Sequence, residues 1–356
     1  MRHLSRLVKN LAILLSLILC VWCAAEKLDS WAKALTDSLP PSASSPSPSP
    51  SPQSAPVWSE EGLSSSQTML GLPDDGIVPI HSDLLPDLEA SPDPNRAWKE
   101  VQELQLDGGT QVGNFFVRDS TGSGTDLEAA LSQEPDVHIK ADGSVEVLIY
   151  HTHTSESYSQ SAPGFYYTDM ETRTQNQDLS VVAAGEELAK ALESRGIGVV
   201  HDKTVNDSAY NGSYSRSWEV IQSNLEKHPG IQVTIDLHRD SMTTEEGIKY
   251  KPTAQIEGRK AAQAMIIAGC DADGSWGDFP DWEYNLQLIL RVQQKAQELY
   301  PGLMRPLNFS NSKYNMNATH GSMLIEVGTE VNTAGEARYT GQLLGEILAE
   351  TLKGLE

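Results

Sequence analysis

The sequence has few cysteines and few basic residues, and each shortage excludes a class of protein. Three cysteines occur in 356 residues, and two of them, Cys20 and Cys23, lie in an N-terminal hydrophobic segment. No disulfide framework is therefore available, and Cys270 is expected to be an inert thiol. Lys and Arg number 26 against 49 Asp and Glu, which gives a formal net charge of -23. Nucleic acid is not an expected partner, because binding its phosphates requires clustered basic side chains.

Several familiar catalytic motifs are also missing. The sequence has no glycine-rich phosphate loop, no Gly-x-Ser-x-Gly nucleophile elbow and no credible pair of cysteine and histidine. These absences exclude the common phosphate-binding loops and the common covalent hydrolase sites. The chemistry must come from another arrangement of side chains.

Residues 1–25 have the pattern of an export signal. Three basic residues within the first ten positions precede an uncharged hydrophobic run. They outnumber the two lysines that follow the run, which favours an uncleaved signal anchor with a cytoplasmic N-terminus. We therefore expect a single N-terminal membrane helix, with the rest of the chain extracytoplasmic. A cleaved signal peptide and a secreted protein are the alternative, since the small residues at 23–25 partly match a cleavage site.

Residues 26–140 are predicted to be a linker and a poorly ordered region. Residues 39–56 consist almost entirely of Pro, Ser, Ala and Gln, a composition that cannot bury a core and favours extended, semi-rigid segments. Residues 57–140 remain rich in Asp, Pro, Gly and Ser, and only residues 97–106 have a helical period. This part of the chain is expected to be a spacer with at most a small structured adjunct.

Residues 141–356 alternate between strand and helix patterns and are predicted to form one folded domain. The strand patterns are at 145–150, 197–200, 231–237, 262–268 and 323–327, and the helical patterns are at 179–194, 214–227, 281–299 and 333–352. This alternation predicts an α/β fold with a doubly wound, mostly parallel sheet flanked by helices.

The first of these strands ends in two histidines and a glutamate. Residues 147–150 are apolar on both faces, as expected for a strand buried between helical layers. If the chain stays extended past Tyr150, then His151 and His153 lie on the same face at the carboxyl end of the strand, with Glu156 close behind. Ligands bind at such strand ends in open α/β sheets. A His-x-His pair alone is also typical of a surface loop, so other evidence is needed.

Two further strands deliver titratable side chains to the same end of the predicted sheet. His238 directly follows one of them, and Glu326 lies on the last. Together with a histidine and Glu156 from the first strand, they have the content of a catalytic zinc site, namely three ligands, an open position for water and a carboxylate that acts on that water. Taken singly, His238 could be an ordinary strand-end residue, and Glu326 could pair with Arg239 or Arg338.

Three sequence blocks resemble those of a known family. The blocks are Tyr-His-Thr-His-Thr-Ser-Glu-Ser-Tyr at 150–158, Asp-Leu-His-Arg-Asp at 236–240 and Leu-Ile-Glu-Val-Gly-Thr at 324–329. In this order they resemble the stage II sporulation protein P family, membrane-anchored peptidoglycan hydrolases of endospore-forming bacteria. The segments 201–204 and 210–217 are also similar, so that the resemblance covers about 140–356.

This resemblance implies a fold similar to the zinc-dependent N-acetylmuramoyl-L-alanine amidases. It implies cleavage of the amide bond between the lactyl group of MurNAc and L-alanine, with endopeptidase activity on stem-peptide cross-links. It also implies a role in engulfment of the forespore, with a lytic transglycosylase, stage II sporulation protein D, as a partner. Two alternatives are a non-catalytic scaffold that binds peptidoglycan and an enzyme that is chiefly a cross-link endopeptidase.

The resemblance also suggests roles for individual residues. His238 matches the second histidine ligand of the amidases and Glu326 matches their catalytic carboxylate. Our hypothesis is that His153, Glu156 and His238 hold Zn²⁺, while Glu326 takes a proton from water and passes it to the leaving amine. His151 is then a further catalytic residue beside the metal, although it heads the same block as His153 and the choice between them is open.

Two other assignments have alternatives. Glu156 is the first choice for the carboxylate ligand, with Glu171 and Asp178 as alternatives, because the wider amidases take a glutamate from near the start of the first helix. Arg239 is assigned either to an ion pair with Asp240 or to binding a carboxylate of the stem peptide.

Overall fold

The structure is a computed structural model that describes residues 91–355. Its helices are α3 (Leu127–Ser132), the short 3-10 helix η2 (Gln177–Leu179), α4 (Val181–Glu193), α5 (Ser213–Lys227), α6 (Trp282–Leu299) and α7 (Ala334–Lys353). Its strands are β1 (Trp98–Leu104), β2 (Thr110–Val112), β3 (Phe115–Asp119), β4 (Val145–Tyr150), β5 (Phe165–Tyr167), β6 (Gly198–His201), β7 (Val233–Asp240), β8 (Lys249–Ile256), β9 (Arg259–Ala262), β10 (Ala264–Gly269), β11 (Leu307–Ser310) and β12 (Gly321–Thr329).

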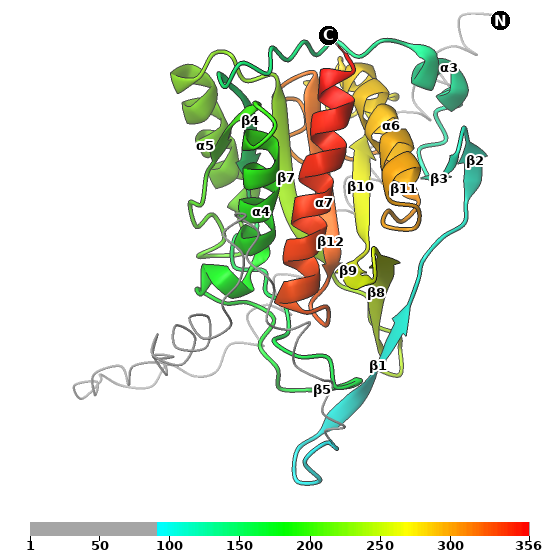
Figure 1. The fold of residues 1–356 in the computed structure, drawn as a ribbon, viewed down its shortest axis with the longest axis vertical. Coiled ribbons are helices and arrows are strands. Elements are labelled where there is room, and N and C mark those ends of the chain that lie inside the picture. The colour runs from blue at the N-terminus through cyan, green and yellow to red at the C-terminus, as the bar shows by residue number, and fades with distance from the viewer. Residues whose placement is uncertain (1–90, 356) are drawn as a thin grey trace, which may run out of the picture. The chain divides into compact units, whose positions relative to one another are not determined.

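Eight strands form the main sheet in the order β2-β3-β11-β10-β12-β7-β4-β6 (Figure 1). Neighbouring strands run parallel except in the pairs β2 with β3 and β10 with β12. The predicted α/β class and the mostly parallel sheet are confirmed, and the two antiparallel pairs make the sheet a mixed one. The antiparallel pairing of β10 with β12 follows from the hairpin of β8 and β9, which lies between β7 and β10 in the chain. A parallel β10 would require a crossover connection instead.

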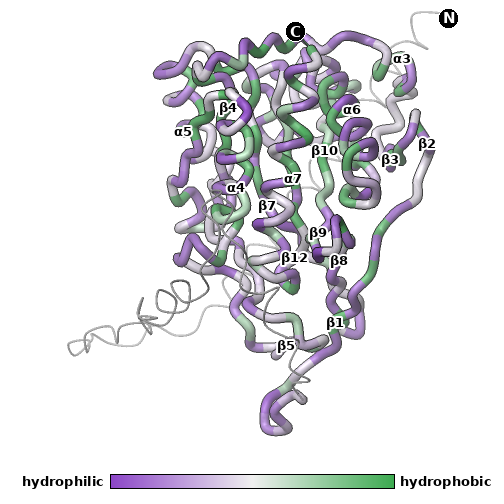
Figure 2. Tube along the Cα trace, viewed as in Figure 1, coloured by the Kyte–Doolittle hydropathy of each residue, from purple (hydrophilic) through white to green (hydrophobic). Residues whose placement is uncertain are grey.

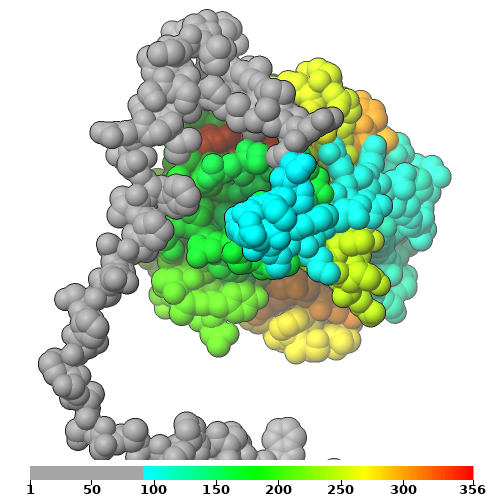
Figure 3. Space-filling view, turned by 90° about the horizontal axis from the view of Figure 1, so that it is seen from below, coloured from blue at the N-terminus to red at the C-terminus, as the bar shows by residue number. Residues whose placement is uncertain are grey.

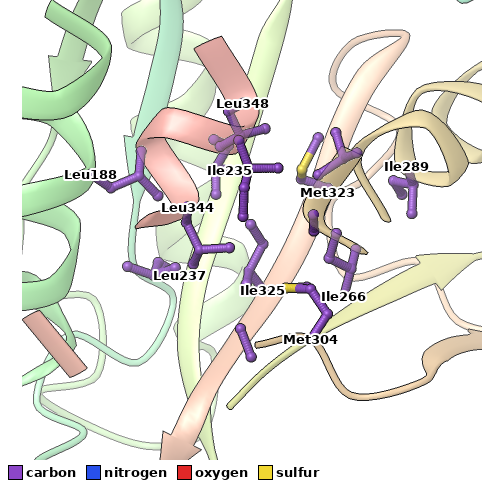
Figure 4. Close-up of a cluster of buried hydrophobic side chains, with 14 of the residues drawn as sticks. Leu188, Ile235, Leu237, Ile266, Ile289, Met304, Met323, Ile325, Leu344 and Leu348 are labelled. Atoms are coloured by element: carbon purple, nitrogen blue, oxygen red, sulfur yellow. The ribbon is translucent and has the colours of Figure 1, made fainter. Parts of the chain in front are cut away.

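Helices α4, α7 and α6 cover one face of the main sheet, and the largest hydrophobic core lies beneath them. Figure 4 shows side chains from this core, including Leu188 of α4, Leu344 and Leu348 of α7, and Ile235 and Leu237 of β7. Figure 2 shows hydrophobic residues concentrated in the strands and helices of this part, with mostly hydrophilic residues along β1 and β5. The sequence starts α7 with a capping box, since Thr333 and Glu336 each accept a hydrogen bond from the other's backbone N–H.

The other face of the sheet carries α5 and a smaller core. Leu148 and Tyr150 of β4 pack there with Ile221 of α5, whereas Val147 and Ile149 belong to the larger core. The alternation confirms that β4 is buried on both faces. Side chains that alternate onto the α5 face build the candidate site.

The folded region begins before residue 141, which corrects the predicted domain boundary. Strand β3 pairs with β11 in the main sheet, and β1 pairs with β8. The helical period at 97–106 was misleading, because β1 gains its hydrogen bonds from neighbours that lie far away in the sequence. The rest of the predicted linker and poorly ordered region, residues 26–90, lies outside the described residues.

A second sheet has the order β5-β1-β8-β9. Seen from below, the cyan surface that includes β1 lies beside the green surface of the segment that includes β5 (Figure 3), in agreement with the antiparallel pairing of the two strands. Within residues 91–355, no helix has the length and hydrophobicity needed to cross a membrane. The predicted signal anchor at 1–25 and the proline-rich spacer lie outside the described residues.

Candidate active site

Parallel pairing of β7 and β12 places His238 beside Glu326. The two residues are direct register partners, and both alternate onto the face of the sheet that α5 covers. Asp236 lies two residues before His238 on the same face, and Leu324 lies next to Asp236 on β12. The carboxyl ends of two neighbouring parallel strands thus bring together the histidine and the glutamate that the sequence predicted would meet.

The chain turns sharply after β4, so His151 and His153 do not share a face. The strand ends at Tyr150 and residues 152–155 form turns. Thr152 anchors this segment to β7 because its N–H and hydroxyl both donate to the carboxylate of Asp236, at 2.8 and 2.6 Å. The expectation of one shared face required an extended chain and is wrong for that reason.

His153, Glu156 and His238 lie together at this turn, and all three are buried. The distance from His238 Nδ1 to Glu156 Oε2 is 3.4 Å. The rings of His153 and His238 are 5.4 Å apart and nearly perpendicular. His153 Nδ1 is buried without a hydrogen-bond partner among residues 91–355. The arrangement therefore contains two imidazoles and a carboxylate, with an unsatisfied nitrogen available as a ligand.

The electrostatic interaction between Glu156 and His238 favours an ionised Glu156. Burial alone would raise the pKa of this carboxyl, but the hydrogen bond and charge of His238, with a smaller contribution from Arg239, outweigh burial and lower the pKa to about 2. Burial would lower the pKa of His238, yet Asp236 and Glu156 raise it well above its usual value. Without a metal, the two negative neighbours hold a proton on His238.

Glu326 has the opposite behaviour. Burial raises the pKa of this carboxyl to about 8, and the charges of Glu156 and Asp240 add to the effect, whereas His238 opposes it. The residue as a whole is partly accessible, but Oε2 is buried and has no hydrogen-bond partner within the described part of the chain. The alternative ion pairs with Arg239 or Arg338 are not formed, since these arginines bind other groups.

The donor set suits zinc. Zn²⁺ binds imidazole nitrogen and carboxylate oxygen at about 2.0–2.2 Å in tetrahedral sites, so two ligand atoms on one ion are about 3.3 Å apart. The 3.4 Å between His238 Nδ1 and Glu156 Oε2 matches that spacing. Residues 91–355 contain no group of three or more His, Cys, Asp or Glu side chains already gathered to hold a metal ion. The atoms that could bind zinc are therefore His238 Nδ1 and Glu156 Oε2, at ligand spacing, and the unsatisfied His153 Nδ1.

Asp236 is positioned to orient His238. Its Oδ1 lies 2.9 Å from His238 Nε2, although the N–H is poorly aligned for a hydrogen bond. A carboxylate behind one nitrogen directs the other nitrogen toward a ligand site, as in many zinc-binding histidines. This contact leaves Nδ1 of His238 facing Glu156.

Arg173, Asp207 and Tyr210 also border the site, and sequence reasoning did not assign them. Arg173 pairs with the buried carboxylate of Asp207 and lies 3.7 Å from Glu156 Oε1. The ring of Tyr210 stacks on His153 at 4.9 Å with an interplanar angle of 3°. The only sequence signal was that Tyr210 lies within one of the blocks resembling the family.

The other predicted residues have different surroundings. Glu171 is exposed, and Asp178 pairs with Arg338 at 3.0 Å, so neither accompanies His238. Arg239 is buried and donates to the backbone carbonyls of Ser157, Thr172 and Asp240. These bonds tie together the segments around the site, which favours a structural role for Arg239 over contact with a substrate carboxylate.

His151 lies beneath α4, on the opposite side from His153. Its Nδ1–H donates to the carbonyl of Leu237 at 2.9 Å, so its Nε2 accepts the N–H of His201 at 2.9 Å. Gly185 of α4 makes room for the pair, since a Cβ there would lie 2.7 Å from His201 Nε2. His151 therefore supports the end of β7 rather than contacting the same groups as His153.

Acidification should destabilise the fold through this histidine pair. Burial lowers the pKa of His151 to about 4 and that of His201 to about 3, so the unfolded chain takes up these protons first. Stability is then present above about pH 6.5 and falls as the pH drops toward 4, by up to about 1.4 kcal/mol per pH unit for each histidine. Urea unfolding at several pH values should show a shallower fall for His201→Asn than for the wild type, and identical slopes would contradict the assignment.

Comparison with known proteins identifies the family. The family model of stage II sporulation protein P matches residues 97–349. The chain belongs to this family. The stage II sporulation protein P of Bacillus subtilis (strain 168) is 29% identical over 217 residues, which cover 57% of this chain and 50% of that protein. This family member therefore spans about half the length of the relative that it matches.

Solved amidase structures are similar to this stage II sporulation protein P family member at low identity. The CwlD amidase from Clostridioides difficile, in complex with the GerS lipoprotein, is 11% identical with a TM-score of 0.36, and the match covers 59% of this chain and 98% of that chain. An N-acetylmuramoyl-L-alanine amidase from Clostridium difficile 630 is 13% identical with a TM-score of 0.35, covering 60% and 96%.

Proposed function

We propose that the chain is a zinc-dependent peptidoglycan hydrolase that cleaves the amide bond between the lactyl group of MurNAc and L-alanine. The observation that carries this proposal is the Glu156–His238 pair at ligand spacing beside Glu326, whose Oε2 is buried. Family membership supports a role in sporulation, and we propose that this role is in engulfment of the forespore. Cleavage of stem-peptide cross-links is a second activity that the same site could support.

His153, Glu156 and His238 would hold the zinc ion. When bound, zinc would supply a Lewis acid that lowers the pKa of a water molecule and polarises the amide carbonyl. Asp236 would keep the ring of His238 in its orientation from behind. Thr152 would hold Asp236 in turn, through its two hydrogen bonds to that carboxylate.

Glu326 would move the proton. An acid with a pKa of about 8 in a buried position can take up a proton and release it near neutral pH, which is what general acid–base catalysis requires. The carboxylate form of Glu326 would accept a proton from water. The protonated form would then donate to the leaving amine of the stem peptide.

Zinc content should separate His153 from His151. We expect His153→Gln and His238→Ala to lose bound zinc, because each removes a nitrogen that has no substitute nearby. His151→Gln should retain zinc, since its Nε2 is engaged by His201. Metal analysis of the purified proteins measures this, with His320→Gln as the matched control at a histidine bound to Asp136. Zinc retained in His153→Gln and lost in His151→Gln would reverse the assignment.

We also propose the wider setting that the family suggests. The N-terminal segment would anchor the protein in the cell membrane, with the folded domain on the extracytoplasmic side facing peptidoglycan. A lytic transglycosylase of the stage II sporulation protein D type would be a partner. Fractionation of cells and co-purification of tagged protein test these two statements.

A further inference from the structure

Three tyrosines form an aromatic strip along the edge of the site. Tyr210 stacks on His153, the ring of Tyr214 meets His153 edge-on at 5.8 Å, and Tyr314 lies 5.6 Å from Tyr214. Tyr210 is 66% exposed and Tyr314 is 39% exposed, whereas most large hydrophobic side chains here are buried. We call Tyr210, Tyr214 and Tyr314 the tyrosine strip. The rings of Tyr210 and Tyr214 both contact the candidate ligand His153, and Tyr314 extends the strip beyond Tyr214.

The backbone at one end of the tyrosine strip has a conformation that is unfavourable for the residue found there, Tyr314. Tyr314 has a φ of 43° and Asn315 has a φ of 59°, both in the left-handed region. Asparagine tolerates this region, but a bulky aromatic residue does so rarely. The side chain of Asn315 holds the turn in place, since it donates to Tyr214 O at 3.0 Å and to Ser217 Oγ at 3.1 Å. Such strain, maintained by specific bonds, is typical of functional sites.

Charge limits what the strip can bind. The carboxylates of Glu156, Asp207 and Asp236 surround the inner end, and Arg173 is already paired with two of them. A phosphate-bearing ligand is further disfavoured by the net charge of -23. The surface offers flat apolar rings with hydroxyl edges, which suits an uncharged ligand that has an apolar face and its own hydroxyl groups.

A pyranose ring has this chemistry, since its C–H groups form an apolar face and its hydroxyls lie around the edge. We propose that the tyrosine strip binds the sugar rings of an uncharged N-acetylhexosamine chain next to the candidate active site. The proposal rests on the proposed function, in which the substrate is a glycan strand bearing peptides. The strip would position the glycan while the amide bond to be cut, between the lactyl group and L-alanine, lies at Glu326 and His238.

Saccharide binding by a variant with a relaxed backbone tests the proposal. Tyr314→Gly removes the ring and also relieves the left-handed strain, so we expect it to be at least as stable as the wild type. We expect its affinity for N-acetylglucosamine tetrasaccharide, measured by NMR titration of the zinc-loaded protein, to fall by roughly 3- to 10-fold. Tyr314→Phe should keep the affinity within about twofold, because the ring face remains.

A matched control is Trp276→Ala, which removes a 46% exposed aromatic side chain outside the strip and should leave the affinity unchanged. The proposal is overturned if the wild type does not bind the tetrasaccharide, or if Tyr314→Gly binds it as tightly as the wild type does. Muropeptide release is measured in parallel. Loss of saccharide affinity in Tyr314→Gly with no hydrolysis by the wild type would refute the proposed function but not the strip, and hydrolysis with unchanged affinity would refute the strip alone.

Discussion

Replacing Glu326 with Gln is expected to lower muropeptide release by about 10²- to 10⁴-fold, the usual contribution of a general acid or base. Gln has nearly the same shape as Glu but cannot take up or release a proton at neutral pH. The buried Oε2 and the pKa of about 8 identify Glu326 as the group that would do so. Bound zinc should be retained, because the proposed ligands are His153, Glu156 and His238.

The matched control for this variant is Glu350→Gln, which makes the same change at an exposed position on α7. It should release muropeptides at the wild-type rate. Full activity in Glu326→Gln would remove Glu326 from the mechanism. Loss of both activity and zinc would instead make Glu326 a part of the metal site.

The second large effect is expected at Gly341, where α7 packs against α4. A Cβ at this position would lie 2.1 Å from the carbonyl oxygen of Ala184. Because that atom belongs to the backbone of a packed helix, it cannot rotate away, and the helices must separate. We expect Gly341→Ala to reduce the free energy of unfolding by about 1–3 kcal/mol, as overpacked cores do.

Urea unfolding measures this effect, and its sign is informative. Without the close contact, Gly→Ala inside a helix would stabilise the protein by about 1 kcal/mol. Gly354→Ala is the control at the end of α7, where a Cβ would meet its nearest atom at 3.3 Å. It should change stability by less than about 0.5 kcal/mol. A stabilised Gly341→Ala protein would show that α4 and α7 are not packed as closely as described.

Long periodic segments of the sequence predicted most of the fold. Helices α4, α5, α6 and α7 begin and end within a few residues of their expected bounds, as do β4, β7 and β12. Their hydrophobic spacing decides both the structure and the buried face. The meeting of His238 and Glu326 was also predictable, because parallel strands in register bring their carboxyl ends together.

Local departures from regular structure were not predictable. The turn after Tyr150 depends on Thr152 reaching Asp236, a contact between segments 84 residues apart. It separates His151 from His153, which no period in the sequence could show. Arg173 reaches Glu156 through a bridge between two loops, and β1 becomes a strand only because β8 and β5 lie beside it. In each case a long-range partner overrides the local pattern.

Mass spectrometry of the products that the zinc-loaded wild-type protein releases from purified peptidoglycan shows whether the amide bond between the lactyl group and L-alanine is cut. We predict free stem peptides with an N-terminal L-alanine, together with glycan strands from which the peptides have been removed. Binding to peptidoglycan without any release would indicate a scaffold. Release through cross-link cleavage alone, with every stem peptide still attached to MurNAc, would contradict the proposed bond.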